Sequence, residues 1–216
     1  IGNLRPVALL NSLYKVFAKA IAVRLGPVLE EWIHPFQTGF VPKRRITHNT
    51  LELQSIYDYA TGLAQPAPLA LALLDIRKAF DSVSHDWLDL VMESAGFPAY
   101  FRRAVRTVTS GGCARVRING YLSDPLPIRR GVRQGCPLSP MLFAVAMDPV
   151  LRRLNSLDNV SSLPLPGCTD GRYRPWAACI PSGARMYADD TALVAFSEYD
   201  LKRMIDIMHE ASPLTG

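Results

Sequence analysis

Tyr187-Ala188-Asp189-Asp190 lies between Ala184-Arg185-Met186 and the apolar run Leu193-Val194-Ala195-Phe196. This order predicts two short hydrophobic strands joined by a tight turn that carries two adjacent carboxylates. Like charges side by side repel each other, and a hairpin turn of this length favours Asn-Gly. A bound divalent cation would remove the conflict, although an Asp-Asp pair alone also fits an ordinary solvated turn.

A third carboxylate has similar surroundings. Asp75 directly follows the apolar run Leu69-Ala70-Leu71-Ala72-Leu73-Leu74, which predicts a fully buried strand. Mg²⁺ prefers oxygen ligands and needs only one or two carboxylates beside the phosphate oxygens of a substrate. Asp75, Asp189 and Asp190 therefore predict a magnesium site, and two ions about 3.5–4 Å apart would suit an in-line phosphoryl displacement.

The spacing of apolar residues predicts the surrounding elements. Helices are expected over residues 12–32 with a possible interruption at Gly26-Pro27, after Thr47, around Trp87–Met92, after Pro98, and after the capping residues Ser139 and Ser197. The first helix is expected to turn an apolar stripe inward, which consists of Leu13, Val16, Phe17, Ala20, Ile21 and Leu25. Residues 155–182 have no periodicity and predict a long irregular surface insertion. Together these elements predict an α+β fold with helices against one antiparallel sheet.

Composition and charge narrow the class of protein. The chain has 216 residues, 49% of them hydrophobic, and can bury a core as one domain or two packed subdomains. Its net charge is +5, and basic residues gather at 43–45, 102–106, 115–117 and 129–133. Arg115 and Arg117 alternate with apolar residues before Asn119-Gly120, which predicts a hairpin with one basic face. Such clusters suit a polyanionic partner, although each alone also fits a solvated surface.

The sequence predicts a soluble intracellular protein with reduced cysteines. No charged-then-apolar signal opens the chain, and no apolar run approaches the roughly 20 residues that span a bilayer. Cys113, Cys136, Cys168 and Cys179 lack the spacing of zinc ligands, so free thiols are expected.

The order of the motifs resembles that of reverse transcriptases. Asp75-Ile76-Arg77-Lys78-Ala79-Phe80-Asp81, Arg133-Gln134-Gly135-Cys136-Pro137-Leu138-Ser139-Pro140 and Tyr187-Ala188-Asp189-Asp190 resemble motifs A, B and C of that family. Upstream, residues 4–11 together with Lys15, Arg24 and Leu25 resemble the first fingers motif, and residues 37–42 (Gln-Thr-Gly-Phe-Val-Pro) resemble the second. Within that family, the residues of these motifs are most similar to those of non-LTR (LINE-type) retrotransposons, with group II intron enzymes next. The five ordered blocks cover nearly the whole chain.

This resemblance implies a right-hand polymerase with fingers and an antiparallel palm sheet backed by helices. Residues 1–68 would be fingers, with part of the fingers returning near 98–130, and residues 69–216 would be palm. The motif D lysine, the thumb and the other domains of a parent polyprotein would lie beyond the chain. The implied function is an RNA-directed DNA polymerase that transfers a nucleotide from a dNTP to a DNA primer on an RNA template, with a nuclear location.

The resemblance also assigns roles to residues. Asp75, Asp189 and Asp190 would be the catalytic acids and would bind two Mg²⁺ ions, or Mn²⁺ in their place, with the backbone carbonyl of Ile76. Phe80 would lie under the incoming sugar and exclude a 2′-hydroxyl, although it also suits a core aromatic. The nucleotide would further contact Gln134, Gly135, Lys15 and Arg5, and the nucleic acid would contact Arg44, Arg45 and Tyr187. Asp81 is expected to be structural.

Two other functions compete with this one. A viral-type RNA-dependent RNA polymerase shares the palm and its acids but would normally carry an acid at the position of Phe80. A domesticated, inactive palm acting as an RNA-binding scaffold would be favoured by the loss of a metal-binding acid, and all are present. The second fingers motif departs from its relatives, since Pro42-Lys43-Arg44-Arg45 stands where they often have Pro-Gly-Arg-Ser, which predicts a less flexible loop.

Overall fold

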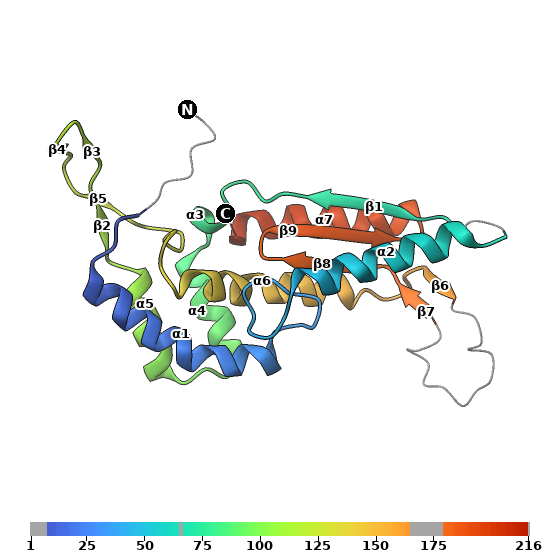
Figure 1. Cartoon of the computed structure of the whole chain (residues 1–216), viewed down its shortest axis with the longest axis horizontal. Helices are drawn as coiled ribbons and strands as arrows, with labels where there is room; N and C mark the ends of the chain where they lie inside the picture. The colour runs from blue at the N-terminus through green and yellow to red at the C-terminus, as the bar shows by residue number, and fades with distance from the viewer. Residues whose placement is uncertain (1–7, 65–66, 165–178, 216) are drawn as a thin grey trace. The chain divides into compact units, whose positions relative to one another are not determined.

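The computed structural model describes residues 8–64, 67–164 and 179–215, which form helices and antiparallel sheets as expected for an α+β protein (Figure 1). The chain divides into two compact units. Unit 1 comprises Ile1–Ile33, Arg77–Met147 and Leu214–Gly216, and unit 2 comprises His34–Ile76 and Asp148–Pro213. The compact units do not follow the fingers–palm boundary expected at residue 68, which is a division by function and stays a prediction.

Unit 2 is built on a three-stranded antiparallel sheet with the order β1-β9-β8. Its strands are β1 (Ala70–Leu74), β8 (Gly183–Tyr187) and β9 (Asp190–Ala195), and β9 pairs with both neighbours. Helix α2 (Ile46–Gly62) contacts β8, and its residues Ile56 and Ala60 share a buried cluster with Leu163, Val194 and Phe196. The predicted hairpin around the two adjacent acids is thus confirmed, as is the helix after Thr47.

The prediction that the strand before Asp75 is fully buried was wrong. Alternate residues of β1 are half-buried and exposed, and Leu71 and Leu73 are 44% and 82% exposed. Leu71 and Leu73 project from the same face of β1, and this face is less covered than the face that carries Ala70, Ala72 and Leu74. A continuous apolar run does not reveal which of its two faces will be covered.

The expected irregular insertion at 155–182 is also partly structured. Residues of β6 (Ser162–Pro164) pair antiparallel with β7 (Cys179–Pro181), so the two ends of the segment form a small sheet. Residues 165–178 of this expected insertion lie outside the described residues.

Unit 1 is mainly helical. Its helices are α1 (Ser12–Trp32), α3 (Ala79–Ser82), α4 (His85–Ser94), α5 (Ala99–Thr109) and the part of α6 (Ser139–Asn155) that ends at Met147. The helices expected around Trp87–Met92, after Pro98 and from Ser139 are confirmed. The large apolar side chains of α6 are buried, as the pattern predicted.

Helix α1 corrects two expectations. It runs without a break through Pro27, and its buried residues are Ala18, Ile21, Ala22, Leu25, Gly26 and Leu29. Leu13, Val16 and Phe17, which were expected to face inward, are exposed. The buried side of the helix contains Ala18 and Ala22, which are weaker hydrophobic signals than the large residues beside them, and α1 contacts α5 within this unit.

The hairpin predicted around Asn119-Gly120 is confirmed in unit 1, although Val116 and Ile118 are exposed together with the arginines. It consists of β2 (Cys113–Ala114), β3 (Arg117–Ile118), β4 (Tyr121–Leu122) and β5 (Leu126–Pro127). Asn119 and Gly120 have φ values of 49° and 88°, and positive φ at both positions is what a type I′ turn requires. Arg115, Arg117 and Tyr121 are all exposed.

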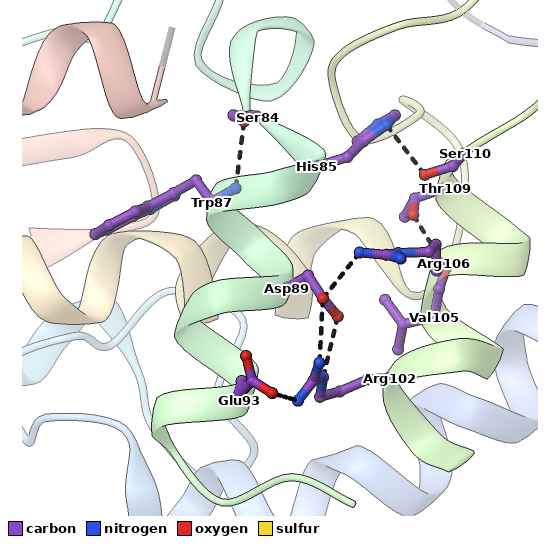
Figure 2. A network of polar contacts seen from close by, with 10 residues as sticks. All are labelled: Ser84, His85, Trp87, Asp89, Glu93, Arg102, Val105, Arg106, Thr109 and Ser110. Atoms are coloured by element: carbon purple, nitrogen blue, oxygen red, sulfur yellow. Dashed lines mark hydrogen bonds and ion pairs between the residues drawn. The ribbon is translucent and has the colours of Figure 1, made fainter. Parts of the chain in front are cut away.

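A polar network joins α4 to α5 (Figure 2). Asp89 accepts hydrogen bonds from Arg102 and Arg106 at 3.1 and 2.9 Å. His85 bonds the hydroxyl of Ser110 at 3.2 Å through Nδ1, and its Nε2 lies 2.9 Å from the carbonyl oxygen of Gly131. The network therefore fixes the backbone at Gly131, just before the residues of motif B.

Two further expectations concern the cysteines and membrane-spanning helices. Cys113, Cys136 and Cys179 are free thiols, as predicted. Over residues 8–64, 67–164 and 179–215, no helix has the length and apolar character needed to cross a membrane.

Asp200 anchors the start of α7 (Glu198–Thr215), the helix expected after Ser197. Its side chain is 1% exposed and accepts hydrogen bonds from the Ser161 amide at 2.8 Å and the Ser182 hydroxyl at 3.2 Å. Its backbone amide donates to Ser197 Oγ at 3.1 Å, so Ser197 caps the helix. Burial alone would raise the pKa of Asp200, but the hydrogen bonds outweigh burial and hold the pKa below its ordinary value.

Asp200→Ala should lower the free energy of unfolding by about 1–3 kcal/mol at neutral pH, because two buried donors lose their acceptor. The lowered pKa means that this stabilisation is present above the unfolded-state pKa of about 3.9 and is lost as the pH falls through the folded-state pKa. Denaturant titrations at neutral and acidic pH measure the difference. Asp206→Ala, at an exposed position of the same helix, is the control. A destabilisation that stays equal across this pH range would contradict the assignment.

Candidate active site

Two of the three predicted catalytic acids line the same groove in unit 2. The pairing of β1 with β9 ends with Leu74 opposite Thr191; Asp75 directly follows Leu74, and Asp190 directly precedes Thr191. Opposed residues of an antiparallel pair project from the same face of the sheet. Both acids are exposed, and with Tyr187 they line a groove of about 300 Å³.

The third acid lies in the turn beside them. Tyr187 pairs with Asp190, so Ala188 and Asp189 form a two-residue loop. Ala188 is buried and has φ 57°, a left-handed conformation that costs a non-glycine residue about 1–2 kcal/mol. Asp189 is half-buried, and its backbone carbonyl accepts a hydrogen bond from Thr191 Oγ1 at 3.4 Å. The loop therefore holds Asp189 next to Asp190 at the end of the sheet that also carries Asp75.

The acids fit a hard divalent cation that shares its ligands with a substrate. In the described part of the chain, no three His, Cys, Asp or Glu side chains cluster closely enough to hold a metal by themselves. Mg²⁺ does not require such a cluster, because one or two carboxylates and the oxygens of a bound phosphate complete its shell. Asp75 and Asp190 supply exposed oxygen donors within one groove.

The groove contains a buried cation that sequence reasoning missed. Arg185 is 3% exposed, donates to Glu52 of α2 at 2.6 Å, and lies with its guanidinium 4.0 Å from the ring centre of Phe36. Ile46, Asn49, Thr50 and Leu53 of α2 line the opposite side. Arg185 belongs to the strand that the sequence predicted, but its partner is far away in the sequence and left no local signal.

Residues 37–40, which were expected to be part of the second fingers motif, lie directly beside the β8–β9 hairpin. Gln37 forms a parallel bridge with Met186, and the amide of Thr38 donates to the carbonyl of Met186 at 2.9 Å. Asn49 Nδ2 donates to the same carbonyl at 2.9 Å. The ring of Phe40 lies 6.1 Å from the ring of Tyr187. The motif was recognised only by its resemblance to the family, and nothing in the sequence predicted that it lies beside β8.

The residues proposed for the sugar and base belong to unit 1. Phe80 is half-buried and stacks on the buried Phe143 with ring centres 4.8 Å apart. Its carbonyl accepts a hydrogen bond from the amide of Val132 at 2.7 Å, which ties motif A to motif B. Gly135 has φ 95°, so glycine is needed there for its conformation. The adjoining Gln134 is half-buried and accepts from the amide of Ala8 at 3.4 Å.

The predicted basic contacts have different surroundings. Lys15 and Arg45 are exposed, while Arg5 lies outside the described residues. Arg44 is half-buried, and its Nη1 donates to the carbonyls of His34 and Gln37 at 2.6 and 2.8 Å, which gives this side chain a structural use. Lys43 has φ 64°, the left-handed conformation that favours the glycine often found at this position in similar enzymes.

The sheet, its acidic hairpin turn and the helices form an α+β arrangement, as the sequence predicted. The chain matches the family "Reverse transcriptase (RNA-dependent DNA polymerase)" over residues 1–213, and it belongs to this family. The predicted relationship to non-LTR retrotransposon proteins is confirmed.

Three relatives illustrate the match. The chain is 39% identical over 94% of its length to "Transposon TX1 uncharacterized 149 kDa protein" of Xenopus laevis. It is 30% identical over 74% of its length to the "Retrovirus-related Pol polyprotein from type-1 retrotransposable element R2" of Popillia japonica. It is 34% identical over 67% of its length to the "RNA-directed DNA polymerase from mobile element jockey" of Drosophila melanogaster. The chain spans 14%, 22% and 16% of these proteins, respectively.

A solved structure supports the fold. The telomerase of Candida tropicalis, in complex with a fragment of telomeric RNA, superimposes with a TM-score of 0.59 over 90% of this chain and 30% of the telomerase chain. The sequences are 10% identical, so this likeness concerns the fold alone.

Proposed function

We propose that this chain is the core of an RNA-dependent DNA polymerase, which adds deoxynucleotides to the 3′-hydroxyl of a DNA primer paired with an RNA template. One observation carries the proposal: Asp75 and Asp190 line one groove beside the turn of Asp189, in a member of the reverse transcriptase family. An intracellular, nuclear location is part of the proposal and follows from the resemblance to non-LTR elements.

We propose that Asp75, Asp189, Asp190 and the carbonyl of Ile76 hold two Mg²⁺ ions, with Mn²⁺ as a substitute. The ions would activate the primer hydroxyl and offset the charge that develops on the triphosphate. The chain itself contributes positioning, because the sheet register and the hairpin fix the backbone of the acids. The ion pair of Arg185 with Glu52 holds a further charge in a fixed place beside them.

Phe80 is proposed to discriminate between deoxyribose and ribose in the incoming nucleotide. A pocket rejects an extra hydroxyl strongly only if a rigid group fills the space that the hydroxyl needs. Stacking on the buried Phe143 restrains the ring of Phe80 in this way. Gln134, Gly135, Lys15 and Arg5 are proposed to contact the rest of the nucleotide. Template and primer contacts are proposed for Arg44, Arg45 and Tyr187.

The basic hairpin supports a polyanionic partner. Arg115 and Arg117 are exposed on it, Arg129 and Arg130 follow it, and Tyr121 is 83% exposed near its tip. Exposed arginines pair with phosphates, and an exposed aromatic ring offers a surface for stacking with a base. We propose that this hairpin contacts the template or the primer.

In a protein that includes the thumb, without which this part of the chain is expected to be poorly active, Asp75→Asn or Asp189→Asn should reduce primer extension on an RNA template at least a hundredfold, because each removes a proposed metal ligand. Binding of primer–template should stay within about twofold, since phosphate contacts come from basic residues elsewhere. Extension with dNTPs and a binding titration measure the two effects, with Asp206→Asn on α7 as the control. Activity above a tenth of the wild-type value would contradict the assignment. Binding without extension by the wild-type protein would favour the inactive scaffold.

Phe80→Val should admit ribonucleotides, because the smaller side chain leaves room for a 2′-hydroxyl, whereas Phe80→Tyr should keep most of the discrimination. The measurement is the ratio of kcat/KM for matched deoxy- and ribonucleoside triphosphates, which we expect to fall at least tenfold in Phe80→Val. An unchanged ratio would mean that the ring only packs in the core. A wild-type preference for ribonucleotides would favour the RNA polymerase alternative.

Arg117→Gln should weaken nucleic-acid binding equally for all sequences and reduce the slope of log K against log salt by about 1, the value for one lost phosphate contact. Binding titrations over a range of salt concentrations measure the slope. Lys202→Gln, which removes an exposed charge from α7, should leave it unchanged. The same slope in both variants would show that the hairpin acts only through net charge.

A further inference from the structure

Gln37 is a wholly buried amide side chain directed at the catalytic turn. It is 0% exposed, and its Oε1 accepts hydrogen bonds from the amides of Ala188 and Gly39, both at 2.9 Å. Two N–H groups meet this atom, so it must be the oxygen of the amide. Its Nε2 lies 3.5 Å from the carbonyl oxygen of Ala188. The side chain of Gln37 therefore lies within hydrogen-bonding distance of both the amide and the carbonyl of Ala188.

Ala188 is the residue of the turn that most needs such support. It has φ 57° and is 2% exposed, so its backbone is strained and shielded from water. It lies inside the two-residue loop between Tyr187 and Asp190, where the β8–β9 ladder supplies no partner for its amide and carbonyl. Buried backbone groups require hydrogen-bond partners, and Gln37 supplies them here.

Gly39 allows the segment that contains Gln37 to approach the backbone of Ala188 closely. A Cβ atom at this position would lie 2.2 Å from the backbone nitrogen of Ala188 and 2.8 Å from the carbonyl carbon of Tyr187. The requirement for glycine is one of space, because Gly39 does not have positive φ. The amide of Met186 donates to the carbonyl of Phe36 at 2.9 Å, so residues 36–39 run along the end of β8.

We propose that Gln37 is a positioning residue for the acids of the turn, and this inference rests on the function proposed above. By clamping the peptide groups of Ala188, it holds the backbone from which the next two residues, Asp189 and Asp190, project. Without the clamp, the strained turn relaxes and the carboxylates leave the geometry that the reaction needs. A displacement of about 1 Å is enough to cost about a hundredfold in rate.

Gln37→Met tests the clamp directly, since it keeps the length of the side chain and removes both hydrogen-bonding groups. In the metal-free protein, amide hydrogen exchange of the peptide that contains Ala188 should become about tenfold faster. Thr38→Val is the matched control, because Thr38 is next to Gln37 and its hydroxyl donates to the carbonyl oxygen of Met186 at 3.4 Å. This substitution removes one hydrogen bond from the same segment and leaves the bonds to Ala188 in place. Gln37→Glu keeps an acceptor for the two amides and should exchange at an intermediate rate.

Activity tests the consequence for the acids. Gln37→Met should lower the single-turnover extension rate about a hundredfold with primer–template affinity unchanged. Ala188→Gly in the same background should recover at least tenfold, because glycine adopts positive φ without strain and needs the clamp less. A purely structural role for Gln37 would show no such recovery.

The two failures are distinguishable. Unchanged exchange at Ala188 in Gln37→Met, or extension that Ala188→Gly does not recover, overturns the clamp. Failure of the wild-type protein to extend a primer overturns the proposed function instead, whatever the exchange rates show. If Gln37→Met does not fold, the comparison of Gln37→Glu with Thr38→Val decides, and equal exchange at Ala188 in these two variants overturns the clamp.

Discussion

The register between β1 and β9 is the constraint on which the site depends. Side chains alternate along a strand, so a slip of one residue would turn Asp75 to the face of the sheet opposite that of Asp190. Residues 191–195 of β9 are buried on both faces, which leaves the central strand one acceptable position. The packing that stabilises the sheet is therefore also what sets the two acids side by side.

Much of the fold could be predicted because its signals are local. Apolar periodicity and caps such as Ser197 located the helices, and Asn119-Gly120 located the hairpin turn. The failures concern burial, which depends on distant partners. The apolar run before Asp75 became a half-exposed edge strand, and the inward face of α1 included small alanines rather than Leu13. The elements that cover one face of β1 or of α1 cannot be inferred from the spacing of residues within that segment.

The residues of the site also differ in whether a local sequence signal predicted them. Asp75, Asp189 and Asp190 were identified from adjacent strands and turn chemistry, and the structure places the first and last of these on one groove. Arg185 and Gln37 gave no local signal of their roles, because Glu52 and Ala188 are far away in the sequence. Resemblance marked Gln37-Thr38-Gly39-Phe40 as important, but only the contacts give the physical reason: an amide that bonds a strained peptide and a glycine that leaves it room.

The edge position of β1 has a consequence for the behaviour of the protein in solution. In the described part of the chain, β1 bonds to β9 and has no strand on its other side, while Leu71 and Leu73 are exposed along it. Unpaired strand edges with apolar side chains invite intermolecular β-pairing and aggregation. Charged residues at the end of such a strand oppose this kind of association, and the exposed Asp75 directly follows β1.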